Sequence, residues 1–293
     1  MKLKHKRSFN WFDIALYLFT FLMIAICLLP FLNVLAESFS ADDAVLSGAV
    51  GFVPVGFNVN TYAYLLGDLR FLKSLLVSVF ITVCGTVLSL FLAVITAYPL
   101  TIKNLRGRGF FMGLLVFTML FQAGIVPRYI MMKQLKLIDT VFVLFVPGLL
   151  NVFNLFIMRN FLAELPAELS EAARIDGANN ISVLFKVLLP LCKPVLATLA
   201  LFYMVAFWND FFTAIIFITS PDKKPLQLFM YEIVNAALSV ESKLGSMSAE
   251  EAHFASDTVR SASVMLATFP ILCVYPFLQK HFAGGLVMGA VKG

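Results

Sequence analysis

Charged residues are scarce in this chain. Asp, Glu, Lys and Arg account for 13% of its 293 residues and hydrophobic residues for 60%, whereas soluble domains carry roughly 25% charge. A soluble fold could not hide so much apolar surface, so the composition excludes an ordinary soluble domain and indicates an integral membrane protein. We expect a single transmembrane domain over residues 1–293, because no linker, internal repeat or low-complexity segment divides the sequence. The net charge of +5 does not indicate a nucleic-acid partner.

Groups that bind metals or carry out catalysis are also rare. The four cysteines and three histidines are scattered and show no CxxC or Cys/His spacing: Cys27, Cys84, Cys192, Cys273, His5, His253 and His281. No Ser/His/Asp set suggests a nucleophile, and no GxxxxGKS or GxxxxGKT motif provides a phosphate-binding loop. We therefore predict no metal site, no cofactor and no catalytic residue in this chain, which we interpret as a non-enzymatic protein.

Six segments have few or no charges and are long enough to cross a bilayer, whose hydrocarbon core of ~30 Å needs about 20 helical residues. They cover residues 14–36, 74–102, 109–127, 140–158, 194–221 and 261–279. Residues 44–67 are also uncharged, but their Gly, Pro and Asn content predicts an ordered extracytoplasmic loop instead of a span. The sequence thus predicts an all-α integral membrane protein with six transmembrane helices.

The N-terminus carries the basic residues Lys2, Lys4, Lys6 and Arg7. Basic flanks of membrane spans stay in the cytoplasm. Because six spans bring the chain back to the side on which it started, we expect both termini to be cytoplasmic. The first apolar run is too long for a cleavable signal peptide and should remain as a span.

The stretch from Leu165 to Pro194 carries mixed charge between apolar blocks and contains a predicted short helix. Pro166 suits the first position of a helix, where no N–H is needed, and Gly177 suits the left-handed residue that ends one. Glu168 and Glu171 share one face of this helix. Two interpretations fit the pattern: the helix inserts into a groove of a partner, or it lies on the lipid surface.

A second short helix should follow the glycine turn. Asn179 or Asn180 can cap its first turn, and residues 181–189 continue it until Pro190, which we expect to stop it. Pro194 then opens the next span. The predicted order is therefore a short helix, a turn, a second short helix and a membrane span.

Asp210 is a charge near the middle of an otherwise apolar segment. Such residues are costly in a bilayer and usually face a cavity or a partner. Its neighbours Trp208, Asn209 and Phe211 combine aromatic rings with hydrogen-bonding groups, a combination that suits a sugar with apolar faces and hydroxyl edges. The alternative is that Asn209 and Asp210 form hydrogen bonds between helices.

Three motifs resemble the permeases of ABC importers. The segment 171–178 reads EAARIDGA and is followed by Leu-Pro at 189–190, as in the EAA loop of that family; Trp-Asn-Asp-Phe at 208–211 and the tail 275–293 are similar to MalG-type second permeases of carbohydrate importers. The resemblance implies a type I permease fold in which the loop forms a cytoplasmic coupling helix on an ATPase subunit. It assigns to ATPase coupling the residues Glu168, Glu171, Ala172, Ala173, Arg174, Asp176, Gly177 and Gly293, and to the substrate pathway Trp208, Asn209, Asp210 and Phe211.

The same resemblance implies the partners and the location. A second, non-identical permease would complete the pathway in the bacterial inner membrane. Two ATPase subunits would supply ATP and Mg²⁺ chemistry, and an extracytoplasmic solute-binding protein would deliver the oligosaccharide. One similar protein is the permease pair of an alginate importer, which makes a uronate oligomer one interpretation of the substrate. The alternative from another class is an ATP-independent channel or an ion-coupled carrier for a polar solute.

Overall fold

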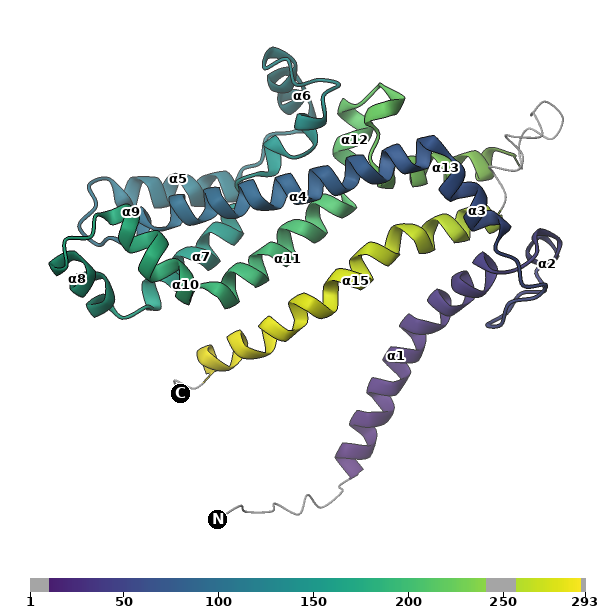
Figure 1. The fold of residues 1–293 in the computed structure, drawn as a ribbon, viewed down its shortest axis with the longest axis horizontal. Coiled ribbons are helices and arrows are strands. Elements are labelled where there is room, and N and C mark those ends of the chain that lie inside the picture. The colour runs from purple at the N-terminus through teal and green to yellow at the C-terminus, as the bar shows by residue number, and fades with distance from the viewer. Residues whose placement is uncertain (1–10, 241–256, 291–293) are drawn as a thin grey trace. The chain divides into compact units, whose positions relative to one another are not determined.

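The computed structural model describes residues 11–240 and 257–290, and these form helices and connecting loops with no strand among them. This confirms the all-α fold class. The longer helices are α1 (Trp11–Ser38), α4 (Leu69–Ala97), α5 (Arg108–Leu120), α6 (Ile125–Gln134), α7 (Val152–Glu164), α8 (Ala167–Ile175), α11 (Lys193–Asn209), α13 (Leu226–Val240) and α15 (Asp257–Ala290) (Figure 1). Shorter ones are α2 (Asp42–Leu46), α3 (Asn60–Gly67), α9 (Asn180–Ser182), α10 (Leu189–Leu191), α12 (Phe212–Phe217), the 3₁₀ turns η1 (Pro99–Thr101), η2 (Val141–Leu144), η3 (Val146–Gly148) and η5 (Pro221–Lys223), and the π-helix η4 (Val183–Leu188).

The chain forms two compact units. The N-terminal unit comprises residues 1–67 and 232–266, and the core unit comprises residues 68–231 and 267–293. Within the N-terminal unit, the loop after α1 is ordered as predicted: the Tyr62 hydroxyl donates to Ser38 Oγ at 2.8 Å, and the Phe39 ring stacks on Phe57 and Tyr62. The Ser261 hydroxyl on α15 donates to Glu37 on α1 at 2.7 Å. These contacts tie the loop and the start of α15 to the end of α1.

The core unit is built around α4, which packs along α11 and α7 (Figure 1). The buried face of α4 carries small and hydroxyl side chains, among them Ser78, Thr82, Gly85, Thr86 and Ser89. Small residues let two membrane helices approach closely where no water is present to drive their association. Close packing of α4 on α11 therefore follows from this stripe.

The predicted spans are recovered in two forms. Among the described residues, three helices are long and apolar enough to cross a membrane alone: Trp11–Ser38, Leu69–Thr101 and Asp257–Val274. Three further spans are obtained only if two helices joined at a bend are counted together as one span. The bend is 116° between α5 and α6, 49° between η2–η3 and α7, and 84° between Asn180–Leu191 and α11. Six spans thus remain compatible with the fold, and the spans predicted over 109–127, 140–158 and 194–221 are each interrupted by a break between helices.

The second short helix of the 165–194 stretch does not stop before Pro190 as predicted. It runs from Asn180 to Leu191, and its central part is the π-helix η4. Pro190 lies inside α10, directly after the wide π turn. A proline ring normally clashes with the carbonyl four residues earlier, and the i→i+5 bonding of a π-helix displaces that carbonyl. The helix therefore continues past the proline and ends at Leu191, with Cys192 as its C-cap.

Candidate functional site

The turn after α8 has the geometry that the sequence indicated. Gly177 lies in the left-handed region with φ +83°. Its N–H donates to the Arg174 carbonyl at 3.0 Å, and the Ala178 N–H donates to the Ala173 carbonyl at 2.9 Å. These two bonds form a Schellman motif, which satisfies carbonyls at the end of the helix. The start differs slightly from the prediction, because Pro166 is the N-cap and α8 begins at Ala167.

One face of α8 packs on the protein and the other is free. Ala173 and Ala178 pack against the hydrophobic cluster that includes Val183, Leu184 and Leu188 of η4. The small alanine side chains bring the backbone of α8 close to η4. The predicted coupling residues Glu168, Glu171, Ala172, Arg174 and Asp176 are all exposed on the remaining surface.

The exposed face of α8 also carries one large apolar side chain, Ile175, at the last residue of the helix. Ile175 is 86% exposed, although the side of α8 that carries the half-buried Ala173 packs on the protein. In the described part of the chain neither Glu168 nor Glu171 takes part in an ion pair. The free face thus combines two unpaired carboxylates with one exposed isoleucine, which is a surface suited to contact another protein.

The turn between the two short helices is held by side-chain hydrogen bonds. Asn179 caps α9 by accepting from the Ser182 N–H at 2.8 Å, which decides between the two predicted caps. Arg174 Nη2 donates to Asn180 Oδ1 at 3.2 Å across the turn. Arg174 therefore has a structural partner within the loop. Gly293, the remaining coupling residue predicted from the sequence, lies outside the described residues.

Asp210 lies at a break in the helix and not in the middle of one. α11 ends at Asn209, and the Asp210 carboxylate accepts from the Thr213 N–H at 3.0 Å, which caps the first turn of α12. Asn209 donates from Nδ2 to the Val205 carbonyl at 3.0 Å. Within the described part of the chain the two polar residues thus make local hydrogen bonds in place of the interhelical bonds of the alternative interpretation. The aspartate has a structural function at the break, and its second oxygen has no bond to the capped turn.

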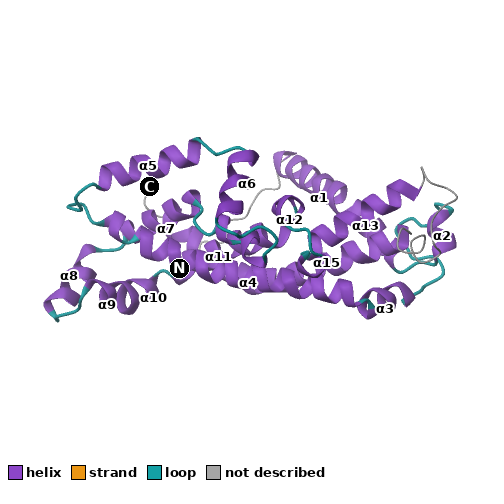
Figure 2. Ribbon diagram, turned by 90° about the horizontal axis from the view of Figure 1, so that it is seen from above, coloured by secondary structure: helices purple, strands orange, loops and turns teal. Residues whose placement is uncertain are grey.

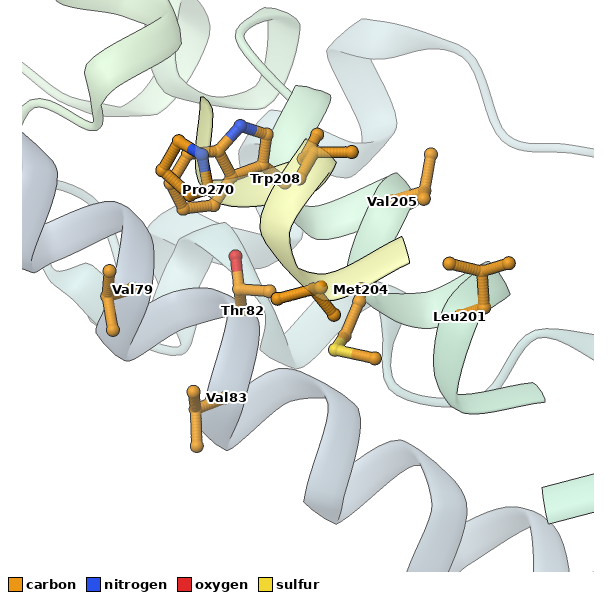
Figure 3. Close-up of a pocket in the computed structure, with 10 residues that line it drawn as sticks. Val79, Thr82, Val83, Leu201, Met204, Val205, Trp208 and Pro270 are labelled. Atoms are coloured by element: carbon orange, nitrogen blue, oxygen red, sulfur yellow. The ribbon is translucent and has the colours of Figure 1, made fainter. Parts of the chain in front are cut away.

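The aromatic side chains next to Asp210 in the sequence lie in different environments. Trp208 is buried, and its indole N–H donates to the Ala267 carbonyl of α15 at 3.1 Å. It lines an apolar cavity of about 170 Å³ together with side chains of α4 and with Pro270 of α15 (Figure 3). Phe211 is 39% exposed and stacks on Tyr231 with ring centroids 5.4 Å apart. The four predicted pathway residues therefore do not form one cluster.

Asp210 lines a second, larger cavity in the core unit. This open cavity of about 780 Å³ lies between α7 and α11 and combines aromatic and amide side chains: Asn151, Phe153, Asn154, Phe202, Tyr203, Phe207 and Asp210, with Gly148, Leu201, Val205 and Ala206. Among these residues of the described chain Asp210 alone is charged. Asn151 also caps α7, because its Oδ1 accepts from the Asn154 N–H at 3.1 Å.

Asn151, Asn154 and Tyr203 are cavity residues that sequence reasoning missed. Asn151 and Asn154 interrupt the apolar segment 140–158 three residues apart, which places them on one helical face. Two amides in a membrane span are a signal of the same kind as Asp210. Tyr203 carries no such signal, since a tyrosine among phenylalanines is indistinguishable from an ordinary core residue.

Comparison with known proteins places this geometry in a family. Residues 6–287 match the family described as "Binding-protein-dependent transport system inner membrane component". The polygalacturonan/rhamnogalacturonan transport system permease protein YtcP of Bacillus subtilis (strain 168) is 40% identical over 282 residues, covering 96% of this chain and 98% of the relative. Protein LplC of the same strain is 42% identical over 282 residues, covering 96% and 95%.

A solved structure has the same fold. It is the crystal structure of a bacterial ABC transporter involved in the import of the acidic polysaccharide alginate, whose matching chain is 33% identical, with a TM-score of 0.85 and coverage of 95% of this chain and 99% of the other. Such a match supports a permease and does not favour an ATP-independent channel or carrier. The chain belongs to the family of binding-protein-dependent transport system inner membrane components, and it is a transport permease of the ABC importer class and not an enzyme.

Proposed function

We propose that this chain is one of two non-identical permeases of an ATP-driven oligosaccharide importer in a bacterial inner membrane. The observation that carries the proposal is the family match over residues 6–287 together with the exposed, acid-bearing α8. Two ATPase subunits bind ATP and Mg²⁺ on the cytoplasmic side, and a solute-binding protein delivers the sugar on the other side. With α8 in the cytoplasm, both termini of the chain are also cytoplasmic.

The helix α8 is the element that couples to the ATPase. Its inner face is fixed on η4 through Ala173, and its outer face offers Glu168, Glu171, Ala172 and Ile175 to a cleft. The Schellman turn at Gly177 sets the direction in which the helix leaves the membrane domain. Movement of the ATPase is then transmitted through η4 to α11, because the same chain continues from one into the other. Gly293 stays a predicted member of this interface.

The cavity between α7 and α11 is this chain's part of the substrate pathway. Aromatic faces such as Phe153 and Phe202 suit the apolar faces of sugar rings, while Asn151 and Asp210 suit their hydroxyl edges. Relatives with related folds are named for polygalacturonan and alginate, so the substrate class is an oligosaccharide that includes uronates. Asn209 and Phe211, both exposed beside the cavity, and Trp208, which positions this segment against α15, complete the predicted pathway.

The coupling proposal is tested by reversing one charge on α8. A charged residue left without its partner at a desolvated interface costs on the order of 2–5 kcal/mol. Glu171→Lys should therefore reduce co-purification of the ATPase subunits and uncouple ATP hydrolysis from uptake, while the permease still inserts. Asp43→Lys makes the same charge change at an exposed position of the N-terminal unit and should leave both properties unchanged. Full ATPase retention and stimulation in Glu171→Lys would show that this face does not bind the ATPase.

A further inference from the structure

Four basic side chains gather at one end of the core unit. The span formed by α4 and η1 is 33 residues long and ends at Thr101. Lys103 and Arg106 lie in the turn that follows, and Arg108 opens α5. Arg159 of α7 joins them because α7 packs against η1 and also against α5; Figure 2 shows the positions of α5 and α7. We refer to Lys103, Arg106, Arg108 and Arg159 as the basic cluster, and its place directly after a membrane span puts it at the depth of the lipid headgroups.

Two guanidinium groups of the basic cluster converge on one backbone oxygen. Arg108 Nε donates to the Leu100 carbonyl at 2.9 Å, and Arg159 Nε approaches the same carbonyl at 3.5 Å. Arg159 makes one further bond, from Nη1 to Asn160 Oδ1 at 2.9 Å. Since each guanidinium carries five N–H donors, most of the donors of both arginines remain available. The shared carbonyl thus holds the planar guanidinium groups of Arg108 and Arg159 next to each other.

The positive charge of the basic cluster is not balanced within the described part of the chain. None of its four members takes part in an ion pair there. Two like-charged guanidinium groups that meet at one carbonyl repel each other unless an anion lies between or above them. Lys103 and Arg106 are exposed and add to this field, while Arg108 and Arg159 are half-buried.

Apolar side chains continue from the basic cluster along α5. Phe110 is 72% exposed, Phe111 51% and Leu114 47%. They lie within the first two turns of the helix that Arg108 opens. An anionic group held by the arginines would therefore have an apolar surface directly beside it, in the direction of the hydrocarbon core.

We propose that the basic cluster binds the headgroup phosphate of an anionic phospholipid, such as phosphatidylglycerol, whose acyl chains lie on Phe110, Phe111 and Leu114. Planar guanidinium forks match the oxygens of a phosphate and bind it through two parallel hydrogen bonds. The cationic headgroup of a zwitterionic lipid would be repelled by four uncompensated positive charges. The site is distinct from α8 and from the cavity, and it does not depend on the function proposed for either.

The test measures lipid retention by the full chain, without ATPase subunits, in detergent. Native mass spectrometry after addition of phosphatidylglycerol or phosphatidylcholine with identical acyl chains should show preferential retention of phosphatidylglycerol. Arg108→Gln/Arg159→Gln should lower that preference about tenfold, because each basic group near a membrane surface strengthens anionic lipid binding several-fold. Phosphatidylglycerol should also raise the thermal midpoint of the wild-type chain and not that of the double variant.

Matched variants separate a built site from general charge attraction. Lys133→Gln/Lys136→Gln removes the same charge from exposed positions at the end of α6 and should keep the preference. Lys103→Gln/Arg106→Gln removes cluster charges that make no side-chain hydrogen bond in the described residues, so its weaker retention would not reflect misfolding. Equal loss in the α6 variant, or equal retention of both lipids by the wild-type chain, would overturn the proposal and indicate that the cluster faces a protein or bulk lipid.

Discussion

The Phe207 ring packs closely against two glycines, Gly85 and Gly148. A Cβ atom added at Gly85 of α4 would stand 2.8 Å from the Phe207 ring, and one added at Gly148 of η3 would stand 3.3 Å from it. The ring also stacks on Tyr203, with centroids 6.3 Å apart. Two other elements, α4 and η3, and a neighbour on its own helix therefore restrict one side chain that lines the cavity.

We predict that Gly85→Ala destabilises the protein by about 1–3 kcal/mol, because the added methyl group would overlap the Phe207 ring and force it out of its packed position. The measurement is the thermal midpoint in detergent. Gly113→Ala, at a helical glycine of α5 with no atom within 4 Å of the added Cβ, is the control and should be neutral or slightly stabilising. Adding Phe207→Leu to Gly85→Ala should restore part of the loss, and strictly additive effects would contradict the contact.

A charged residue in an apolar segment does not by itself reveal its structural role. Asp210 was singled out from the sequence as a charge near the middle of a span, a position that suggested a charge within a continuous helix. The structure instead ends α11 at Asn209 and uses Asp210 to cap α12. Asp is a good helix cap wherever it occurs, and nothing in an apolar run tells a cap from a buried charge. The glycines around Phe207 were invisible for a related reason, since their partner is far away in sequence.

In the loop after α6, the Asp139 carboxylate holds the chain against the loop that contains Thr219 and Ser220. Asp139 has φ +54°, and its side chain accepts from the N–H groups of Thr219 and Ser220 at 3.0 and 2.9 Å. Lys223 Nζ lies 3.3 Å from the same carboxylate. Hydrogen bonds from Ser220 and Thr219, with Lys223, hold the pKa of Asp139 well below its usual range. One residue thereby joins the α6–η2 connection to the α12–η5 connection.

Asp139→Asn should lower the thermal midpoint at neutral pH while keeping the left-handed backbone, which asparagine also tolerates. Because the folded-state pKa is depressed, the stabilisation is fully present above the unfolded pKa of about 3.9 and is lost only as the pH falls through the folded value. The difference between wild type and variant should therefore stay constant from pH 5 to pH 8. Asp222→Asn, which removes an exposed pair with Lys73, is the control and should have a small effect. A difference that grows or shrinks within that window would contradict this account.

Helices were predicted best where backbone chemistry determines them. Gly177 and Asn179 have specific conformational roles, so the turn of the 165–194 stretch could be placed from sequence. Hydropathy measures only composition, and it cannot detect the 116° bend between α5 and α6, because residues 121–124 carry no charge and lie inside the predicted span 109–127. The π-helix before Pro190, which packs against α8, has no residue pattern that would distinguish it from an α-helix in the sequence.

At the scale of the whole molecule, much apolar surface has no partner within the chain. No residue in the span window of α1 is buried, and α5 has no buried residue in the described structure. Such surface is stable only against lipid or against other subunits. A permease of this family works as part of an assembly, so the exposed face of α1, the free face of α8 and the open cavity are consistent features of one component of a larger transporter.

The final prediction concerns how this component is oriented in the membrane. Lys2, Lys4, Lys6 and Arg7 should keep the N-terminus in the cytoplasm, so the exposed loop after α1 should be outside and the 165–194 stretch inside. Cysteines placed at Ser47 and Ile181, both exposed, test the two sides with a membrane-impermeant maleimide. The background first needs replacement of the native thiols Cys27, Cys84, Cys192 and Cys273.

In intact cells Ser47→Cys should be labelled and Ile181→Cys should not, and both should react after the membrane is permeabilised. Retained uptake by the background without native thiols verifies that the labelled protein is folded. Labelling of Ile181→Cys alone in intact cells would invert the orientation, and α8 could then not reach an ATPase that uses cytoplasmic ATP. Labelling at both positions would instead mean that only one of the bent pairs α5–α6 and η2–α7 crosses the membrane, because the span that begins with α4 also crosses once between the two positions.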